Sequence, residues 1–330
     1  APNFETFRSN FLARAGKAFI VPAKTFDNVP SNFPIGFFTW YTTDKQPISE
    51  IIADVFDKYG ESMGTKRLAV EQEVSTINDW IVATRNRTGE KKIGFMYAAG
   101  CDFQHQNYNY IINEKFQLPH PRGTQITDMN LREIAIYLAV RHSVQKNWLN
   151  DRDQFTNPNA TWKQDVDFQN DCLAYTLFST ANNIQSNKGI NHWQPFTEEE
   201  LGITNELSDH FMTDYISGKG RPKAIQGNLF DDSQNENSPL VFSEEAKAVF
   251  DAGRELWKYY HKQPDADLNA AYYDIRKYFQ GTKLDKKGKE VMNSASEDET
   301  YTKLHAALRK AHKLLAKKIV PKVYEHGFLR

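Results

Sequence analysis

The content of aromatic side chains constrains the fold of this chain more than any other feature of its sequence. The 330 residues include 22 Phe, 15 Tyr and 6 Trp, although the mean hydropathy is only -0.66. So much ring area can build a core, and the composition therefore excludes general disorder. No run of the sequence approaches the roughly 20 consecutive apolar residues that a membrane helix requires. We expect a folded chain of one to three domains that contacts no membrane.

Charge and cysteine content narrow the class of protein further. The 41 Lys and Arg residues almost balance 42 Asp and Glu, for a net charge of -1. This balance excludes a uniformly polybasic binder but allows local basic faces, because a net charge averages over the whole surface. Cys101 and Cys172 are too few for a disulfide framework or a zinc quartet. Because Phe4, Arg8 and Arg14 interrupt any apolar leader, we expect a reduced, cytoplasmic protein.

The hydrophobic pattern of the first half mixes helical and strand signals. Residues 3–14 carry an apolar stripe at helical spacing, and Gly16 is expected to end that helix. Residues 17–21 and 33–41 are apolar runs without alternation, which is typical of strands buried on both faces. Residues 52–70 predict a β-hairpin turning at glycine. Further short elements are expected at 77–82 (helix), 93–97 (strand) and 108–112 (strand).

After about residue 125 the pattern becomes mainly helical. Side chains that can accept hydrogen bonds from first-turn amides mark the helix starts. These are Asp128 or Asn130, Thr197 with Glu200, Ser243, and Ser296 with Glu299. A helix is also expected at 168–181, and the Gly-, Pro- and Asn-rich stretch 218–239 predicts an internal loop. The predicted fold class is α+β, with mixed strands in the N-terminal part and a mainly helical C-terminal half.

Only weak catalytic patterns are present. The sequence has no glycine-rich phosphate loop, no Gly-x-Ser-x-Gly and no zinc-finger spacing. Asp265 and Asp285 faintly imitate the carboxylate pair that holds Mg²⁺ in many nucleases. His142 with Asp151 or Asp153 could form a general-base pair. We favour coincidence for the first pattern and a packed helix-end histidine for the second.

Amide side chains interleaved with aromatic rings indicate a function more strongly than the catalytic patterns do. The chain has 25 Asn and 16 Gln, many of them between Cys101 and Trp193, as in the run QHQNYN at 104–109. Asn and Gln can bond bidentately to adenine edges, and rings can stack on unstacked bases. Asn is also common in turns for reasons of its own backbone. The pattern therefore indicates nucleic-acid contact, with turn formation as the alternative.

The last thirty residues are strongly basic. Segment 301–330 holds eight Lys or Arg and one Glu, a net charge of +7. Its Leu residues recur at helical spacing, so the segment predicts an amphipathic helix with a basic face. Such a face suits a phosphate backbone. It equally suits a solvated surface with cations favoured near the helix C-terminus.

Six segments of the chain together resemble a known family. They are GKAFIVPAKTFDNV (16–29), FPIGFFTW (33–40), AVRH (139–142), WLNDRDQF (148–155), FQNDCL (168–173) and FDAGRELWKYY (250–260). They resemble the C-terminal region of large bacterial adenine-specific (N6) DNA methyltransferases of restriction-modification systems. The resemblance extends from about Phe4 to Leu329.

The resemblance implies that residues 1–45 would be the closing elements of a methyltransferase-type sheet and that the rest would be a module appended to it. Within that rest, the change of pattern near residue 125 separates a small α+β module at 46–125 from a mainly helical module at 126–330. The family binds S-adenosylmethionine through a glycine-containing motif and clamps the flipped adenine with Asn/Asp-Pro-Pro-Tyr/Phe. Neither motif occurs, and NPNA at 157–160 is no substitute. The chain is thus expected to be a fragment that binds no cofactor, while its parent enzyme uses S-adenosylmethionine.

The role that the resemblance implies is recognition of the target in double-stranded DNA, beside the catalytic domain of the same polypeptide. Basic side chains would hold phosphates, while amides and rings would read bases. The candidate DNA contacts are Arg85, Arg87, Lys91, Lys92, His105, Gln106, Asn107, Tyr108, Arg141, Arg152, Lys219, Arg221 and Lys223. No catalytic or metal-binding residue is predicted. The alternatives are a Mg²⁺-dependent nuclease part of a fused enzyme and a docking module that uses the terminal leucine stripe.

Overall fold

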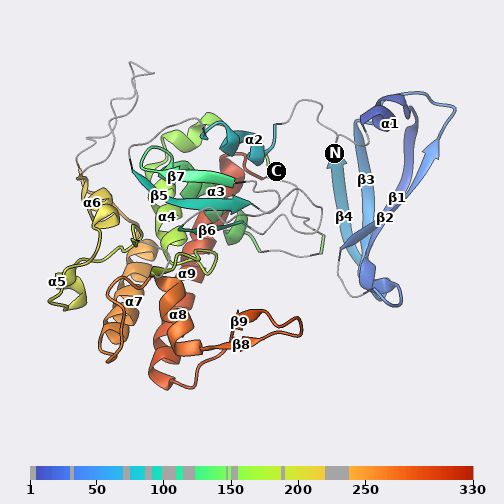
Figure 1. The fold of residues 1–330 in the computed structure, drawn as a ribbon. Coiled ribbons are helices and arrows are strands. Elements are labelled where there is room, and N and C mark those ends of the chain that lie inside the picture. Colours follow the sequence, from blue (N-terminus) through green and yellow to red (C-terminus); the bar gives the residue numbers. More distant parts are fainter. Residues whose placement is uncertain are drawn as a thin grey trace, which may run out of the picture. The chain divides into compact units, whose positions relative to one another are not determined.

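The computed structural model divides the chain into two compact units (Figure 1). The first unit comprises residues 1–75 with 145–154, and the second comprises 76–144 with 155–330. The residues whose structure is described are 5–29, 33–69, 75–85, 91–98, 109–113, 123–145, 148–149, 155–186, 190–219 and 238–329. The boundary near residue 75 falls inside the module expected at 46–125.

Unit 1 is built on a four-stranded mixed sheet. Its elements are α1 (Glu5–Asn10), β1 (Arg14–Pro22), the 3₁₀ turn η2 (Ala23–Thr25), β2 (Pro34–Tyr41), β3 (Glu50–Phe56) and β4 (Ser62–Ala69). The strand order is β2-β1-β3-β4, with β1 antiparallel to β2 and parallel to β3. The hairpin β3–β4 turns where the carboxylate of Asp57 accepts the amides of Tyr59 and Glu61. The strands expected around 17–21 and 33–41 and the hairpin at 52–70 are confirmed.

The predicted helix at 3–14 is too long, and Gly16 does not end it. Helix α1 stops at Asn10, and Gly16 lies inside β1. A Cβ on Gly16 would lie only 2.5 Å from Oγ1 of Thr39 on β2. The Thr39 hydroxyl donates a hydrogen bond to the carbonyl of Lys17 at 2.9 Å, which draws the two strands together. This glycine therefore serves a close cross-strand approach, which a helical stripe in the sequence does not reveal.

The strands of unit 1 are not buried on both faces, contrary to expectation. Phe19 on β1 is 42% exposed, and its cross-strand partner Phe37 on β2 is 40% exposed. The opposite face carries a small buried cluster of Ala18, Ile20 and Ala53. An apolar run shows that both faces of a strand are apolar, but whether anything covers them depends on the rest of the fold.

Unit 2 combines a three-stranded antiparallel sheet with a larger set of helices. The sheet has the order β6-β5-β7, formed by β5 (Lys92–Ala98), β6 (Asn109–Ile112) and β7 (Gly123–Thr127). The helices are α2 (Ile77–Val82), α3 (Leu131–Ser143), α4 (Val166–Leu177), α5 (Glu198–Leu201), α6 (Phe211–Ser217), α7 (Glu244–His261), α8 (Tyr272–Gln280) and α9 (Glu299–Glu325), with a 3₁₀ turn η3 (Ala160–Lys163) and the hairpin β8 (Thr282–Leu284)–β9 (Glu290–Met292). The α+β fold class is confirmed.

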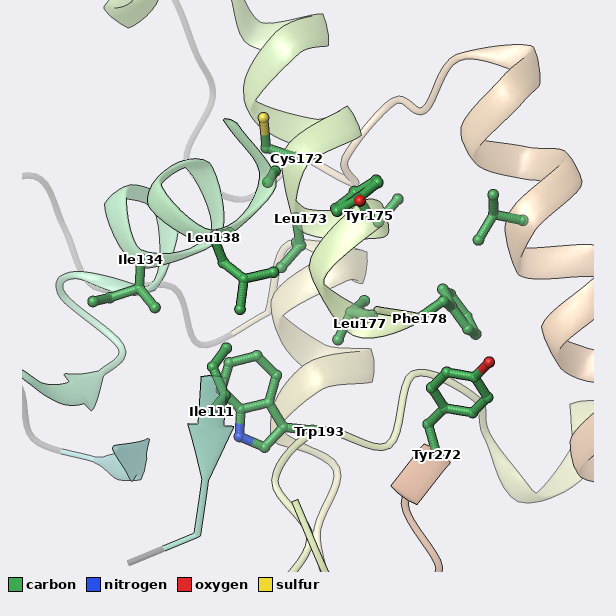
Figure 2. Packing of buried hydrophobic residues seen from close by; sticks show 14 of the residues in the cluster. Ile111, Ile134, Leu138, Cys172, Leu173, Tyr175, Leu177, Phe178, Trp193 and Tyr272 are labelled. Carbon is green, nitrogen blue, oxygen red and sulfur yellow. The ribbon is translucent and has the colours of Figure 1, made fainter. Parts of the chain in front are cut away.

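The core of unit 2 lies between its sheet and the helices α3, α4, α7 and α9. Figure 2 shows Leu138 of α3, Leu177 of α4 and Ile111 of β6 pointing into one interior beside Trp193. The indole Nε1 of Trp193 donates to the carbonyl of Ile93 at 2.7 Å, so this ring is both packed and hydrogen-bonded. Most of the predicted leucine stripe of α9 is buried here, through Leu308, Leu315 and Ile319, whereas Leu304 is half-buried. The buried part of the stripe packs inside its own unit, and docking through the stripe stays a prediction.

The helix caps agree with the sequence at two of the four predicted starts. Asn130 directly precedes α3 but makes no capping hydrogen bond with its side chain, and the start of α9 differs as well. Thr197 forms the predicted capping box with α5, and Ser243 caps α7 by accepting an amide hydrogen bond. Asp298, rather than Ser296, caps α9, and the Ser296 hydroxyl donates instead to the carbonyl of Phe279. A Ser and an Asp two residues apart are both able to cap, so only the tertiary contact decides between them. Of the described helices, none is both long enough and apolar enough to cross a membrane.

Candidate nucleic-acid interface

The structure describes five of the thirteen predicted DNA-contact residues. The other eight lie outside the described residues: Arg87, His105, Gln106, Asn107, Tyr108, Arg152, Arg221 and Lys223. Of the five described, Arg85 after α2, Lys92 at the start of β5 and Lys219 after α6 are exposed. They belong to different parts of unit 2, and their contacts with DNA stay predictions.

Two of the described candidates are already engaged in contacts within unit 2. Arg141 is only 4% exposed, and its guanidinium lies 5.1 Å from the centre of the Tyr137 ring. Nη1 of Arg141 also donates to the Tyr137 hydroxyl at 3.2 Å. Arg85 directs Nε to the hydroxyl of Thr124 on β7 at 3.0 Å. Arg141 is therefore packed in the core of unit 2, and its predicted contact with DNA stays a prediction.

Lys91 is neutralised by a buried carboxylate. Its ammonium lies 2.5 Å from Oδ2 of Asp209, and Nδ1 of His192 reaches the same oxygen at 2.9 Å. Burial opposes ionisation of Asp209, but hydrogen bonds from Lys91 and the amide of Phe211 outweigh it and lower the pKa of the carboxyl. Asp209 is thus ionised at neutral pH. The charge of Lys91 is balanced here and contributes little to a basic surface.

The basic segment at the end of the chain separates into paired and unpaired cations on α9. Lys318 lies 3.0 Å from the buried carboxylate of Asp171, and Lys322 lies 2.9 Å from Asp165. Lys303 approaches Glu299 at 3.9 Å. For these three lysines the interpretation as an ordinary helix face with internal ion pairs is the better one.

Three other lysines of α9 form an exposed stripe. Lys310, Lys313 and Lys317 follow the i, i+3, i+7 spacing that puts side chains on one helix face. All three are exposed, and within the described part of the chain none of them has an ion-pair partner. At 1.5 Å of rise per residue the stripe covers roughly 10 Å. The same length of DNA duplex carries about six phosphate charges.

One group of side chains has the spacing of a metal site, but its members already form ion pairs with one another and with a lysine. Asp165, Glu325 and His326 bring ligand atoms within 4.8 Å of one another near the end of α9. The ammonium of Lys322 bridges the two carboxylates at 2.9 and 3.0 Å, and His326 Nε2 lies 3.0 Å from Asp165. Hydrogen bonds from Lys322 and His326 lower the pKa of Asp165 despite its burial. A lysine charge at the centre of the group opposes a cation, so these contacts tie α4 to α9.

The two weak catalytic patterns have local partners as well. Asp265 accepts a hydrogen bond from the Tyr278 hydroxyl at 2.6 Å. Asp285 accepts the amides of Lys287 and Lys289 in the turn of the β8–β9 hairpin. His142 Nε2 lies 3.1 Å from the carbonyl of Asn109. Its proposed partners Asp151 and Asp153 lie outside the described residues.

Comparison with known proteins identifies no relative. No protein-family model matches the chain, and neither a curated protein nor a solved structure matches it. The candidate nucleic-acid interface on α9 therefore rests on the geometry of its lysine stripe alone. These three lysines were not among the thirteen predicted contacts, although the net charge of the segment and the i, i+3, i+7 spacing are visible in the sequence.

Proposed function

We propose that this chain is the DNA target-recognition module of a bacterial restriction-modification N6-adenine DNA methyltransferase. The observation that carries the proposal is the stripe of Lys310, Lys313 and Lys317 on α9. These three exposed lysines lie on one helix face and have no carboxylate partner among the described residues, in a protein of net charge -1. Uncompensated cations in a row on a rigid helix suit a phosphate backbone. The sequence resemblance to the family supports the same conclusion.

The proposal divides the work between two kinds of side chain. Lys310, Lys313 and Lys317 supply contacts to phosphates, which give affinity without sequence preference. The readers of bases are the predicted residues His105, Gln106, Asn107 and Tyr108, which are tested by substitution. The chain holds neither an S-adenosylmethionine loop nor an adenine clamp, so methyl transfer needs a catalytic domain of the same polypeptide in the bacterial cytoplasm.

The surface of unit 1 supports a place next to such a domain. Phe19 and Phe37 stack at 4.7 Å on a sheet face where both remain about two-fifths exposed. Exposed apolar patches on a folded unit mark contact surfaces more often than chance. The strands β1 and β2 are then the closing strands of a methyltransferase-type sheet.

A salt titration tests the role of the stripe. Binding of a fluorescent duplex to the full chain is measured at rising salt for the wild type and for the triple variant Lys310→Gln, Lys313→Gln, Lys317→Gln. Removing three phosphate contacts is expected to reduce the slope of log K against log salt by about 2.7. The matched control is Lys247→Gln, Lys258→Gln, Lys262→Gln, which removes the same charge around α7 and leaves the slope unchanged.

A target-recognition module must also bind some DNA sequences more tightly than others. The parent family acts at defined sites, so a panel of duplexes should separate into strong and weak binders by at least about tenfold. Substitution of Asn107 or Gln106 by Ala should reduce this separation while leaving the salt slope intact. Absence of binding to every duplex at low salt, or equal affinity for all of them, would overturn the proposal.

A further inference from the structure

A polar cluster joins α8 and α9 at the edge of the unit 2 core. The hydroxyl of Tyr272 lies 3.1 Å from Nε2 of His305, and the ring of Tyr301 stacks on His305 at 5.3 Å. The guanidinium of Arg276 lies 5.6 Å from the centre of the Tyr272 ring. Arg309 follows His305 by one helical turn, so it shares that face of α9. Figure 2 shows Tyr272 beside Phe178 of the buried core.

The two arginines have no counter-charge among the described residues. Nη1 of Arg276 donates a long hydrogen bond, 3.4 Å, to the carbonyl of Thr180. Nε of Arg276, Nη1 of Arg309 and the hydroxyl of Tyr301 are buried and have no hydrogen-bond partner within the part of the chain that the structure describes. By contrast, Arg254 in the same unit contacts the carboxylates of both Glu200 and Asp251.

Without a bound ligand, these unpaired donors and charges destabilise the folded protein. A buried N–H group without an acceptor loses its hydration without recompense, and a charged group loses more. Two cations that face the same rings also repel each other. Burial together with Arg276 and Arg309 lowers the pKa of His305 to about 4, so the imidazole stays neutral and adds no third charge. An anion would supply both the missing acceptors and the missing charge.

We propose that Arg276, Arg309 and the Tyr301 hydroxyl form a binding site for a phosphate group. Guanidinium groups bind phosphate through charge-assisted, often paired hydrogen bonds. Tyr301 stacks on His305, and both arginines act electrostatically on the same imidazole. A phosphate held beside this ring would be offered Nε of Arg276, Nη1 of Arg309 and the Tyr301 hydroxyl as donors. The site uses side chains separate from the lysine stripe and stands whether or not the chain recognises DNA. Inorganic phosphate, a small phosphate ester and a nucleic-acid phosphate share the chemistry that it selects.

Calorimetric titration of the full chain with inorganic phosphate tests the site. Wild type is expected to bind phosphate saturably, and Arg276→Gln or Arg309→Gln to weaken binding about tenfold or more, because each removes a charge-assisted bond. Arg132→Gln, an exposed arginine on α3, is the matched control and leaves binding unchanged. Tyr301→Phe removes one donor with little change of volume and is expected to weaken binding by several-fold.

Thermal melts keep the test decisive if a variant is poorly folded. Phosphate is expected to raise the melting temperature of wild type by mass action, and to raise it less in both arginine variants. Without phosphate, Arg276→Gln is expected to melt no lower than wild type, since it relieves repulsion. Bound phosphate that is displaced by a short duplex assigns the site to nucleic acid, and bound phosphate that stays assigns it to a small phosphate compound. Absence of saturable binding to wild type, or equal binding to Arg276→Gln and wild type, would overturn the proposal.

Discussion

The two units of this protein use the same kind of side chain in opposite ways. In unit 2 the rings pack against one another inside the core, as where Trp257 meets Phe178 at 5.8 Å and Phe196 at 5.7 Å. In unit 1 the stacked pair Phe19–Phe37 lies on a sheet face and keeps about two-fifths of its surface exposed. Aromatic content by itself thus predicts that rings will cluster, but not that the cluster will be buried.

The difference teaches where the stability of each unit comes from. Unit 2 covers its sheet with its own helices, and most of its large apolar side chains are fully buried. The buried cluster of unit 1 consists of three small or medium residues, with partly buried neighbours such as Trp148. Burial of apolar area is the main source of folding free energy. Unit 1 therefore draws less stability from its rings than unit 2 does.

Truncating one ring in each unit should show the largest effect of this difference. Trp257→Ala is expected to lower the free energy of unfolding of unit 2 by about 3–5 kcal/mol, since it leaves a large cavity. Phe37→Ala should cost unit 1 less than about 1 kcal/mol, because the ring is already partly in water. Urea unfolding of the full chain, followed by amide exchange in each unit, measures both values. Equal losses would contradict the comparison.

Acidification should destabilise unit 2 selectively. His312 is buried against the Tyr175 carbonyl, and burial lowers its pKa to about 3 from an unfolded value of 6.5. The unfolded chain thus binds a proton before the folded chain does, so stability is full above pH 6.5 and falls as the pH drops toward 3. The loss is about 1.4 kcal/mol for each pH unit in that window.

Unit 1 provides the internal control for this pH effect. None of the nine histidines falls within 1–75 or 145–154, so unit 1 has no histidine to titrate in this window. Surface His210 acts in the opposite direction, because its hydrogen bond to Glu198 raises its pKa. Thermal melts between pH 7 and 5 for wild type and His312→Gln measure the slope. Because the lowered pKa of His305 gives a slope of the same sign, His312→Gln is expected to reduce the slope without abolishing it. A slope equal to that of wild type would show that His312 is not responsible.

Glycine substitutions should separate packing from backbone strain. A Cβ on Gly253 of α7 would lie 2.3 Å from Cε1 of Phe178, so Gly253→Ala is expected to cost unit 2 about 1–3 kcal/mol through overpacking. In unit 1, Gly64 has open space around its Cβ position but a φ of +104°. Gly64→Ala should cost about 1–2 kcal/mol through its backbone. A second substitution, Phe178→Leu, should recover part of the first loss and none of the second.

The smallest effect on stability is expected at the exposed sheet face. Phe19→Gln should change the free energy of unfolding of unit 1 by less than about 0.5 kcal/mol, as is usual for surface positions. It should nevertheless reduce self-association of the chain, because it removes part of an exposed apolar patch. Light scattering against concentration measures this. Unchanged scattering would mean that the Phe19 face is not a contact surface.

Local chemistry in the sequence determined much of this fold. The apolar runs gave strands β1 and β2, the turn glycines accompanied the β3–β4 hairpin, and Thr197 and Ser243 marked two helix starts, because each signal lies within a few residues of the element it specifies. The apolar stripe of α9 could be predicted for the same reason, because its residues recur at helical spacing. The sequence also located the basic charge in the last thirty residues.

Only the tertiary structure decided which of these side chains are available to a ligand. Lys318 and Lys322 of α9 are held by carboxylates on α4 or at its start. Lys313 on the same helix is exposed and has no such partner among the residues whose structure is described. Arg276 and Arg309 act on the same rings although they belong to different helices. Burial and pairing are sums over contacts between distant parts of the chain, and a local pattern of residues carries no record of them.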